Sequence, residues 1–211
     1  AAVIRSLGSS EAIVVGQGLG AWIAWCMPSL QPGIAAKIGA LSMPHPRIIR
    51  SASFRNREQM AASSYVVELQ RPFVPERLMA RDHTFVEKYL RGWASPFGEW
   101  PAPSDVERYA AAMALPFVAH SAAEYYRWIG RTQLRPDGPM FNRRIKGAIT
   151  APVLQLQGTE DRAVLASATR GSERYVVGPY RYELIEGAGH FLAEESPARV
   201  SDIITDWAAA T

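Results

Sequence analysis

Short apolar runs near the start of the chain predict buried strands. Residues 11–16 (EAIVVG) form a β-branched run without polar alternation, which is typical of a strand covered on both faces. Residues 19–30 (LGAWIAWCMPSL) predict an apolar helix that ends at Pro28 or shortly after, and residues 35–46 (AAKIGALSMPHP) predict the next strand. Strand, helix and strand within about thirty residues form a βαβ unit, so we expect a parallel sheet and an α/β fold.

The pattern changes in the middle of the chain. Between residues 47 and 148 there are no strong strand signals, many aromatic residues and several helical stretches, such as 105–115 and 121–133. A long insertion between core strands commonly forms a lid over a site.

The α/β pattern returns in the last third of the chain. Residues 151–161 predict a strand that ends in acidic residues, 180–191 a second strand that ends beside a histidine, and 196–210 an amphipathic closing helix. We therefore predict an α/β core at 1–46, a helical cap at 47–148 and the rest of the core at 149–211.

A glycine-rich turn between the first strand and the first helix has two interpretations. Gly16, Gly18 and Ala21 fit G-x-G-x-x-A, a turn that holds the phosphates of a dinucleotide. Gly16, Gly18 and Gly20 fit G-x-Nu-x-G, the turn that carries the nucleophile in one class of hydrolases, here with glycine in the nucleophile position.

The surrounding sequence favours the hydrolase interpretation. A dinucleotide site needs an acidic residue about 20 residues past the glycines, to hold the ribose hydroxyls. No Asp or Glu occurs between Glu11 and Glu58. A hydrolase of this type instead needs a nucleophile, an acid and a histidine, in that order, each following a strand. Gly18, Asp161 and His190 follow three predicted strands in that order.

With these motifs, the chain resembles the epoxide-hydrolase branch of the α/β-hydrolase fold over nearly its whole length. The resemblance is carried by VVGQGLGAWIAW, ALSMPHP, SSYVVELQRPF, EYYRW, QLQGTEDRAV and IEGAGHFLAEESP. It implies an α/β-hydrolase core with an inserted helical cap. Asp161 then matches the charge-relay acid and His190 the base, while the family's nucleophilic aspartate is replaced by Gly18. The backbone N–H of Leu19 would stabilise the oxyanion.

The resemblance also implies two tyrosines in the cap that donate hydrogen bonds to the epoxide oxygen. Tyr65 and Tyr126 match them by local motif, and Tyr125 is the alternative if the register differs by one residue. Both tyrosines could instead be ordinary aromatic residues that pack the cap. Gln70 and Arg71 are candidates for supporting Tyr65.

Gly18 departs from the family pattern, because glycine has no side chain to attack a substrate. Removing the nucleophile of a catalytic triad typically costs on the order of a million-fold in rate. We expect two-step hydrolysis through a covalent ester to be absent. Any remaining activity, by direct attack of water, would be slow.

The first strand is a second departure. The family has further strands and an oxyanion loop before this point, whereas residues 1–10 resemble the end of a helix that stops at Gly8. Left alone, the strand after Glu11 would be an exposed apolar edge. We expect the chain to be the C-terminal piece of a longer protein, with an N-terminal fragment or second chain on this edge.

Composition and charge limit which partners and cofactors we expect. The 211 residues are 48% hydrophobic with a net charge of +3, and the arginines are scattered among acids, so we expect no nucleic-acid partner. Cys26 is the only cysteine and is expected to pack in the core. No apolar run approaches the roughly 18 residues of a membrane span, and we expect a cytoplasmic protein without metal or cofactor.

Three functions therefore stand as alternatives. The first is an epoxide-hydrolase-like enzyme for a small hydrophobic epoxide, with activity weakened or lost through Gly18. The second is a non-catalytic protein that binds a small molecule or acts as a scaffold, and the third is an NAD(P)-dependent oxidoreductase. Of the remaining histidines, His45 is expected to shape the cap entry, and His83 and His120 to be surface or core residues.

Overall fold

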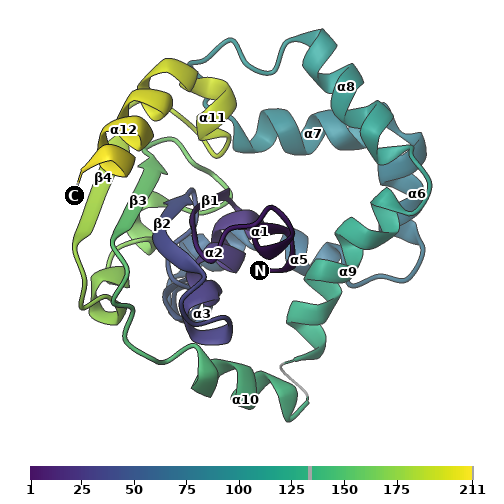
Figure 1. Ribbon diagram of the computed structural model, residues 1–211. Helices are drawn as coiled ribbons and strands as arrows, with labels where there is room; N and C mark the ends of the chain where they lie inside the picture. The colour runs from purple at the N-terminus through teal and green to yellow at the C-terminus, as the bar shows by residue number, and fades with distance from the viewer. Residues whose placement is uncertain (133–134, 211) are drawn as a thin grey trace.

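The computed structural model describes residues 1–132 and 135–210. Within them, four parallel strands form one sheet in the order β1-β2-β3-β4 (Figure 1). The strands are β1 (Ala12–Gln17), β2 (Ala35–Leu41), β3 (Val153–Gly158) and β4 (Tyr180–Ile185). The α/β class predicted from the apolar runs is confirmed.

The carboxyl ends of the strands meet along one edge of the sheet. Gln17 at the end of β1 lies opposite Leu41 at the end of β2, and Gly158 at the end of β3 lies opposite Ile185 at the end of β4. The segments that follow β1, β3 and β4 therefore start close together.

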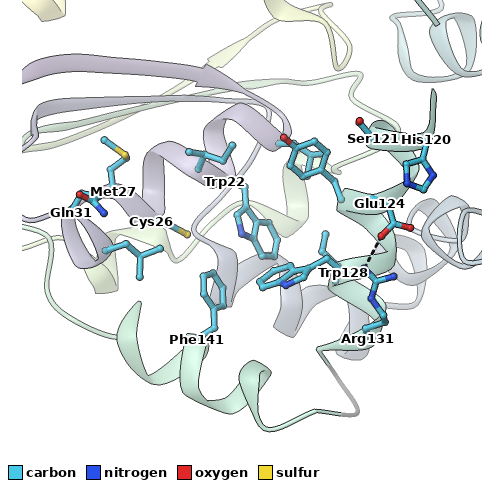
Figure 2. A pocket seen from close by; sticks show the side chains of 15 residues that line it. Trp22, Cys26, Met27, Gln31, His120, Ser121, Glu124, Trp128, Arg131 and Phe141 are labelled. Atoms are coloured by element: carbon cyan, nitrogen blue, oxygen red, sulfur yellow. Dashed lines mark hydrogen bonds and ion pairs between the residues drawn. The ribbon is translucent and has the colours of Figure 1, made fainter. Parts of the chain in front are cut away.

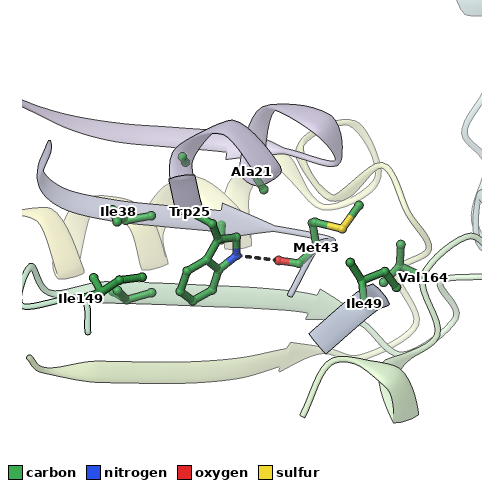
Figure 3. Close-up of a cluster of buried hydrophobic side chains, with 10 residues drawn as sticks. Ala21, Trp25, Ile38, Met43, Ile49, Ile149 and Val164 are labelled. Atoms are coloured by element: carbon green, nitrogen blue, oxygen red, sulfur yellow. Dashed lines mark hydrogen bonds between the residues drawn. The ribbon is translucent and has the colours of Figure 1, made fainter. Parts of the chain in front are cut away.

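Helices cover the two faces of the sheet. They are α2 (Leu19–Leu30), α11 (Leu192–Glu195) and α12 (Pro197–Ala209), while α1 (Ala2–Ser6) precedes β1 and buries none of its residues. On one face, Ala21 and Trp25 of α2 pack against Ile38 of β2 (Figure 3), and the Trp25 indole donates a hydrogen bond to the Met43 carbonyl at 3.1 Å. On the other face, α12 places Val200, Ile203 and Trp207 against Leu154 and Leu156 of β3.

Strand β1 differs from the prediction that both of its faces are covered. Val14 packs toward the α2 side, but Ile13 and Val15 point the other way and are each 42% exposed. In the described part of the chain, β1 is one of the two edge strands, and the cluster under α12 draws its sheet residues from β2, β3 and β4. The apolar run predicts burial but not which neighbours provide it.

A helical segment connects β2 to β3 and arches away from the sheet (Figure 1). Its helices are α3 (Pro46–Arg55), α4 (Arg57–Ala62), α5 (Tyr65–Glu68), α6 (Val74–Arg81), α7 (His83–Trp93), α8 (Pro103–Met113), α9 (Val118–Arg131) and α10 (Asp137–Arg144). We call this segment the cap. The helix predicted over 121–133 corresponds to α9, and its final position, 133, lies outside the described residues.

The cap has a small apolar core of its own. Val86 and Leu90 of α7 pack against Val106 and Ala110 of α8. Phe191, from the loop after β4, packs against the same cluster. The cap therefore contacts the segment of the core that carries His190.

Candidate active site

Gly18 forms a sharp turn between β1 and α2. Its backbone has φ 55° and ψ −119°, which glycine adopts without steric cost. Its N–H donates to the Leu41 carbonyl at 2.9 Å, and its carbonyl accepts from the Trp22 N–H at 3.0 Å. A Cβ added to Gly16 would lie 2.3 Å from the backbone of Gly20, so this turn tolerates no side chain at Gly16. The geometry is that of a strand-to-helix turn that projects its central residue outward.

A side chain at position 18 would point at His190. An ideal Cβ built there lies 3.3 Å from His190 Nε2 and 3.9 Å from Cε1, and no other described atom beyond its chain neighbours is within 4 Å. The imidazole therefore faces the place where the turn would present a nucleophile.

Asp161 lies in the loop after β3 and is only 2% exposed. Its Oδ1 accepts hydrogen bonds from the backbone N–H groups of Ala163 and Val164, at 2.9 and 2.8 Å. Its Oδ2 is 2.9 Å from His190 Nδ1 and accepts from Gln157 Nε2 at 2.9 Å. A carboxylate that accepts this many hydrogen bonds has a fixed orientation. Because Asp161 holds Nδ1 of His190, the other ring nitrogen, Nε2, points toward Gly18.

His190 is the group in this site whose protonation matters most. Burial lowers the pKa of its imidazole, but Asp161, Glu195 and Glu194 together outweigh burial and raise that pKa above 6.5. The residue is 9% exposed. Only the neutral imidazole can accept a proton, so His190 can act as a base above its raised pKa and not below it.

The N-terminus of α2 lies beside the same point. Leu19 is the first residue of α2, so its N–H has no partner within the helix. The first N–H groups of a helix attract negative charge. The Leu19 N–H therefore lies where an oxyanion donor is predicted from the sequence.

Tyr65 and Tyr126 come together from two cap helices. Their ring centroids are 5.5 Å apart at an interplanar angle of 81°. Burial is the main cause that raises the pKa of Tyr126 to about 12 and that of Tyr65 well above 10. Both phenols therefore keep their protons at neutral pH and can act as hydrogen-bond donors. Tyr125 points elsewhere and is 58% exposed.

Gln70 connects the helices that carry this tyrosine pair. Its Nε2 donates to the carbonyls of Val66 in α5 and Tyr126 in α9, both at 2.9 Å. α9 approaches so closely that a Cβ at Gly130 would lie 2.4 Å from Gln70 Oε1. The Arg71 carbonyl accepts from Arg127 at 2.6 Å, which links the same two segments.

Trp93, at the end of α7, lies between the tyrosine pair and the base, and the sequence patterns did not indicate it. Its ring is 4.7 Å from that of Tyr65 and 5.7 Å from that of His190. Its carbonyl accepts the His190 N–H at 2.9 Å. The sequence patterns also missed Gln157, which donates to Asp161 four residues further along the chain, and Glu195, which bonds to Ser95 a hundred residues away.

Two cavities adjoin Leu19, and both are mainly apolar. The inner cavity has a volume of about 410 Å³ and is lined by the tyrosine pair together with residues such as Met43, Ile49 and Val164. The outer cavity, of about 750 Å³, lies between α2 and α9 (Figure 2). Trp22, Trp128 and Phe141 line both cavities and point toward one another.

The remaining candidate residues lie away from this constellation. His45 is fully buried at the start of α3, where its Nδ1 accepts the Arg47 N–H and its ring stacks on Tyr175. His83 and His120 are exposed. Burial raises the pKa of the Cys26 thiol to about 12, so it is not a thiolate at neutral pH.

Two features are absent from the part of the chain that the structure describes. The described residues contain no cluster of three or more His, Cys, Asp or Glu placed to hold a metal ion. None of their helices has the length and apolar character needed to cross a membrane.

Comparison with known proteins identifies the family. The model of the "Alpha/beta hydrolase family" matches residues 1–203. The chain belongs to the alpha/beta hydrolase family. Membership of this family favours the hydrolase interpretation of the glycine-rich turn over the dinucleotide interpretation.

The individual relatives are similar to this chain at low identity. AB hydrolase superfamily protein YfhM of Bacillus subtilis is 26% identical over 97% of this chain and 68% of its own length. Epoxide hydrolase 3 of Xenopus tropicalis is 25% identical over 97% of this chain and 54% of its own length. The chain thus spans between about half and two thirds of these relatives.

Solved structures show the same fold. A mutant epoxide hydrolase from Bacillus megaterium matches 99% of this chain and 72% of its own, with a TM-score of 0.77 and 22% identity. Epoxide Hydrolase A from Mycobacterium thermoresistibile matches 97% of this chain and 71% of its own, with a TM-score of 0.76 and 22% identity.

Proposed function

We propose that this chain carries an epoxide-hydrolase-like site for a small hydrophobic epoxide. The observation that carries the proposal is that His190, oriented by Asp161, faces the Gly18 turn, while the phenols of Tyr65 and Tyr126 line the neighbouring inner cavity. Opening an epoxide requires a nucleophile at carbon and a proton donor at oxygen, and a base that activates water together with neutral phenols can meet both needs. The apolar lining of the inner cavity suits a hydrophobic substrate.

The residues present support direct attack by water. Neutral His190 takes a proton from a water molecule as its oxygen bonds to an epoxide carbon and the carbon–oxygen bond of the ring breaks. A tyrosine hydroxyl donates its proton to the resulting alkoxide, giving a diol, and the tyrosinate regains a proton from the imidazolium through solvent. No ester forms at position 18, since Gly18 has no side chain, and we expect turnover to be slow.

The tyrosine pair provides the test of this function. Tyr65→Phe and Tyr126→Phe each remove one donor, and we expect each to lower the rate of epoxide opening about ten- to a hundredfold, with a larger loss in the double variant. Tyr125→Phe is the matched control, because it removes the same hydroxyl group from the exposed neighbour of Tyr126. This variant should keep full turnover. Turnover of a reactive aryl epoxide, followed as diol formation, measures all four variants. Equal effects at Tyr125 and Tyr126 would contradict the assignment.

Gly18 also favours a second candidate function, a binding protein without catalysis. In that case the inner cavity holds an apolar ligand and the His190–Asp161 pair has no chemical role. Titration with an epoxide and its diol separates the two functions. Saturable binding of both without any diol formation supports the binding protein, whereas diol formation that depends on His190 supports the enzyme.

We further propose that a strand from another polypeptide segment pairs with β1. The support is the edge position of β1 together with the exposure of Ile13 and Val15. Exposed apolar edge strands pair readily with other chains, and natural proteins usually cover them. We expect intact-mass analysis and denaturing electrophoresis of the protein purified from its source to show added polypeptide, and Val15→Lys to weaken that association. A single stable, monodisperse species with the mass of this chain alone would refute the proposal.

A further inference from the structure

The Glu195 carboxylate binds three backbone N–H groups around the base. Its Oε2 accepts from Ser95 and Gly189, both at 2.8 Å, and its Oε1 accepts from Phe191 at 2.9 Å. Gly189 and Phe191 are the two neighbours of His190 in the chain, whereas Ser95 follows helix α7 of the cap. One side chain therefore holds the His190 loop on both sides and ties it to the cap.

The seam between this loop and the cap is tightly packed. The His190 N–H donates to the Trp93 carbonyl at 2.9 Å, so hydrogen bonds cross the seam in both directions. A Cβ added to Gly189 would lie 2.4 Å from the Ser95 nitrogen and 2.6 Å from the Ala94 carbonyl carbon. Only glycine allows this approach, and the seam has no room for water at that point.

The neighbouring carboxylate extends the same connection. Glu194 Oε1 accepts from the Tyr109 hydroxyl of α8 at 2.9 Å, and its Oε2 is 3.4 Å from Nε2 of Gln17, the residue before Gly18. The two glutamates of α11 thus contact the cap, the His190 loop and the Gly18 turn. No Lys, Arg or His within the described ranges forms an ion pair with Glu195.

We propose that Glu195 is a positioning residue for His190, which holds the loop that carries the imidazole against the cap. Its negative charge also favours the protonated imidazole. The charged groups that influence His190 are Asp161 from the loop after β3 and Glu194 and Glu195 from α11. Asp161 orients the ring through Nδ1, while Glu195 holds the backbone from which the ring projects. The role of His190 as a base belongs to the proposed function, but its position and proton affinity can be measured without any turnover.

Glu195→Gln tests the charge. The amide keeps the size of the side chain and one acceptor oxygen, so at most two of the three N–H groups remain bound through oxygen. By imidazole NMR, with the His190 signal assigned by its loss in His190→Gln, we expect the pKa of His190 to fall by about 0.5 to 1. Glu186→Gln is the matched control, because it removes the same charge from an exposed glutamate four residues before His190 and should leave that pKa unchanged.

Glu195→Asp tests the geometry. It keeps the charge but shortens the side chain, so we expect the pKa of His190 to stay close to that of the natural protein while the Ser95 and Gly189 amides exchange at least tenfold faster. An unchanged His190 pKa in Glu195→Gln, or an equal fall in Glu186→Gln, would overturn the proposal. So would unchanged amide exchange in Glu195→Asp. If the pKa and exchange results are as expected but the natural chain does not turn over an epoxide, only the proposed function is contradicted.

Discussion

Replacing Gly18 by aspartate is expected to raise epoxide turnover by about a thousandfold or more. The nucleophile of a triad contributes on the order of a million-fold, and the His190–Asp161 pair and the two tyrosines are in place. A carboxylate on the Gly18 turn would attack the epoxide carbon while Tyr65 and Tyr126 protonate the oxygen, leaving an ester at position 18. Water activated by His190 would then hydrolyse that ester. Mass spectrometry of the rapidly quenched variant should detect the ester as an added substrate mass.

The backbone conformation at Gly18 determines how much stability this substitution costs. At φ 55° a side chain is strained by about 1 to 3 kcal/mol. The new Cβ would lie 3.3 Å from His190 Nε2, so the imidazole must move by a few tenths of an ångström. Gly18→Ala is the control, because it carries the same strain without a nucleophile and should lose stability without gaining activity. A folded Gly18→Asp variant with the His190–Asp161 pair intact but no gain in turnover would contradict the proposed site.

The parts of the site that follow strand ends were predictable from sequence. Asp161 and His190 each lie just beyond an apolar run, and parallel strands bring such positions to one edge of the sheet. The order of Gly18, Asp161 and His190 along the chain was therefore enough to place them together. At these positions the sequence pattern and the parallel topology of the sheet predict the same placement.

The cap residues were harder to place. Tyr125 and Tyr126 are adjacent on α9, and successive helical residues point about 100° apart, so motif matching leaves the choice dependent on register. The structure turns Tyr126 toward Tyr65 and exposes Tyr125. This orientation follows from the packing of α9 against α5 through Gln70, which no local pattern encodes.

Trp93 and Glu195 could not be found from sequence for a related reason. Trp93 looks like one more cap aromatic, and Glu195 one of two adjacent acids on a short helix. Their importance comes from contacts across the seam between cap and core, over separations of about a hundred residues. The apolar run of β1 likewise predicted a strand covered on both faces, but such a run does not specify which neighbours provide the cover.

Asp161→Asn is expected to lower the turnover of the natural chain by about a thousand- to ten-thousandfold. The Asn oxygen can still accept from the Ala163 and Val164 N–H groups, as Asp161 Oδ1 does. Its NH₂ group then faces two donors, Gln157 Nε2 and the protonated Nδ1 of His190. The imidazole avoids this repulsion by moving its proton to Nε2, so the nitrogen that faces Gly18 can no longer accept a proton from water.

The same substitution should change stability in a pH-dependent way. The raised pKa of His190 means that protonated His190 stabilises the folded chain, fully below pH 6.5 and less as the pH rises through the raised value. Asp161→Asn removes most of this contribution and also leaves buried donors unpaired, which costs about 1 to 3 kcal/mol at any pH. Urea unfolding at several pH values measures both parts, and ¹⁵N NMR reports the tautomer. Unchanged turnover with the proton still on Nδ1 would show that Asp161 does not orient the base.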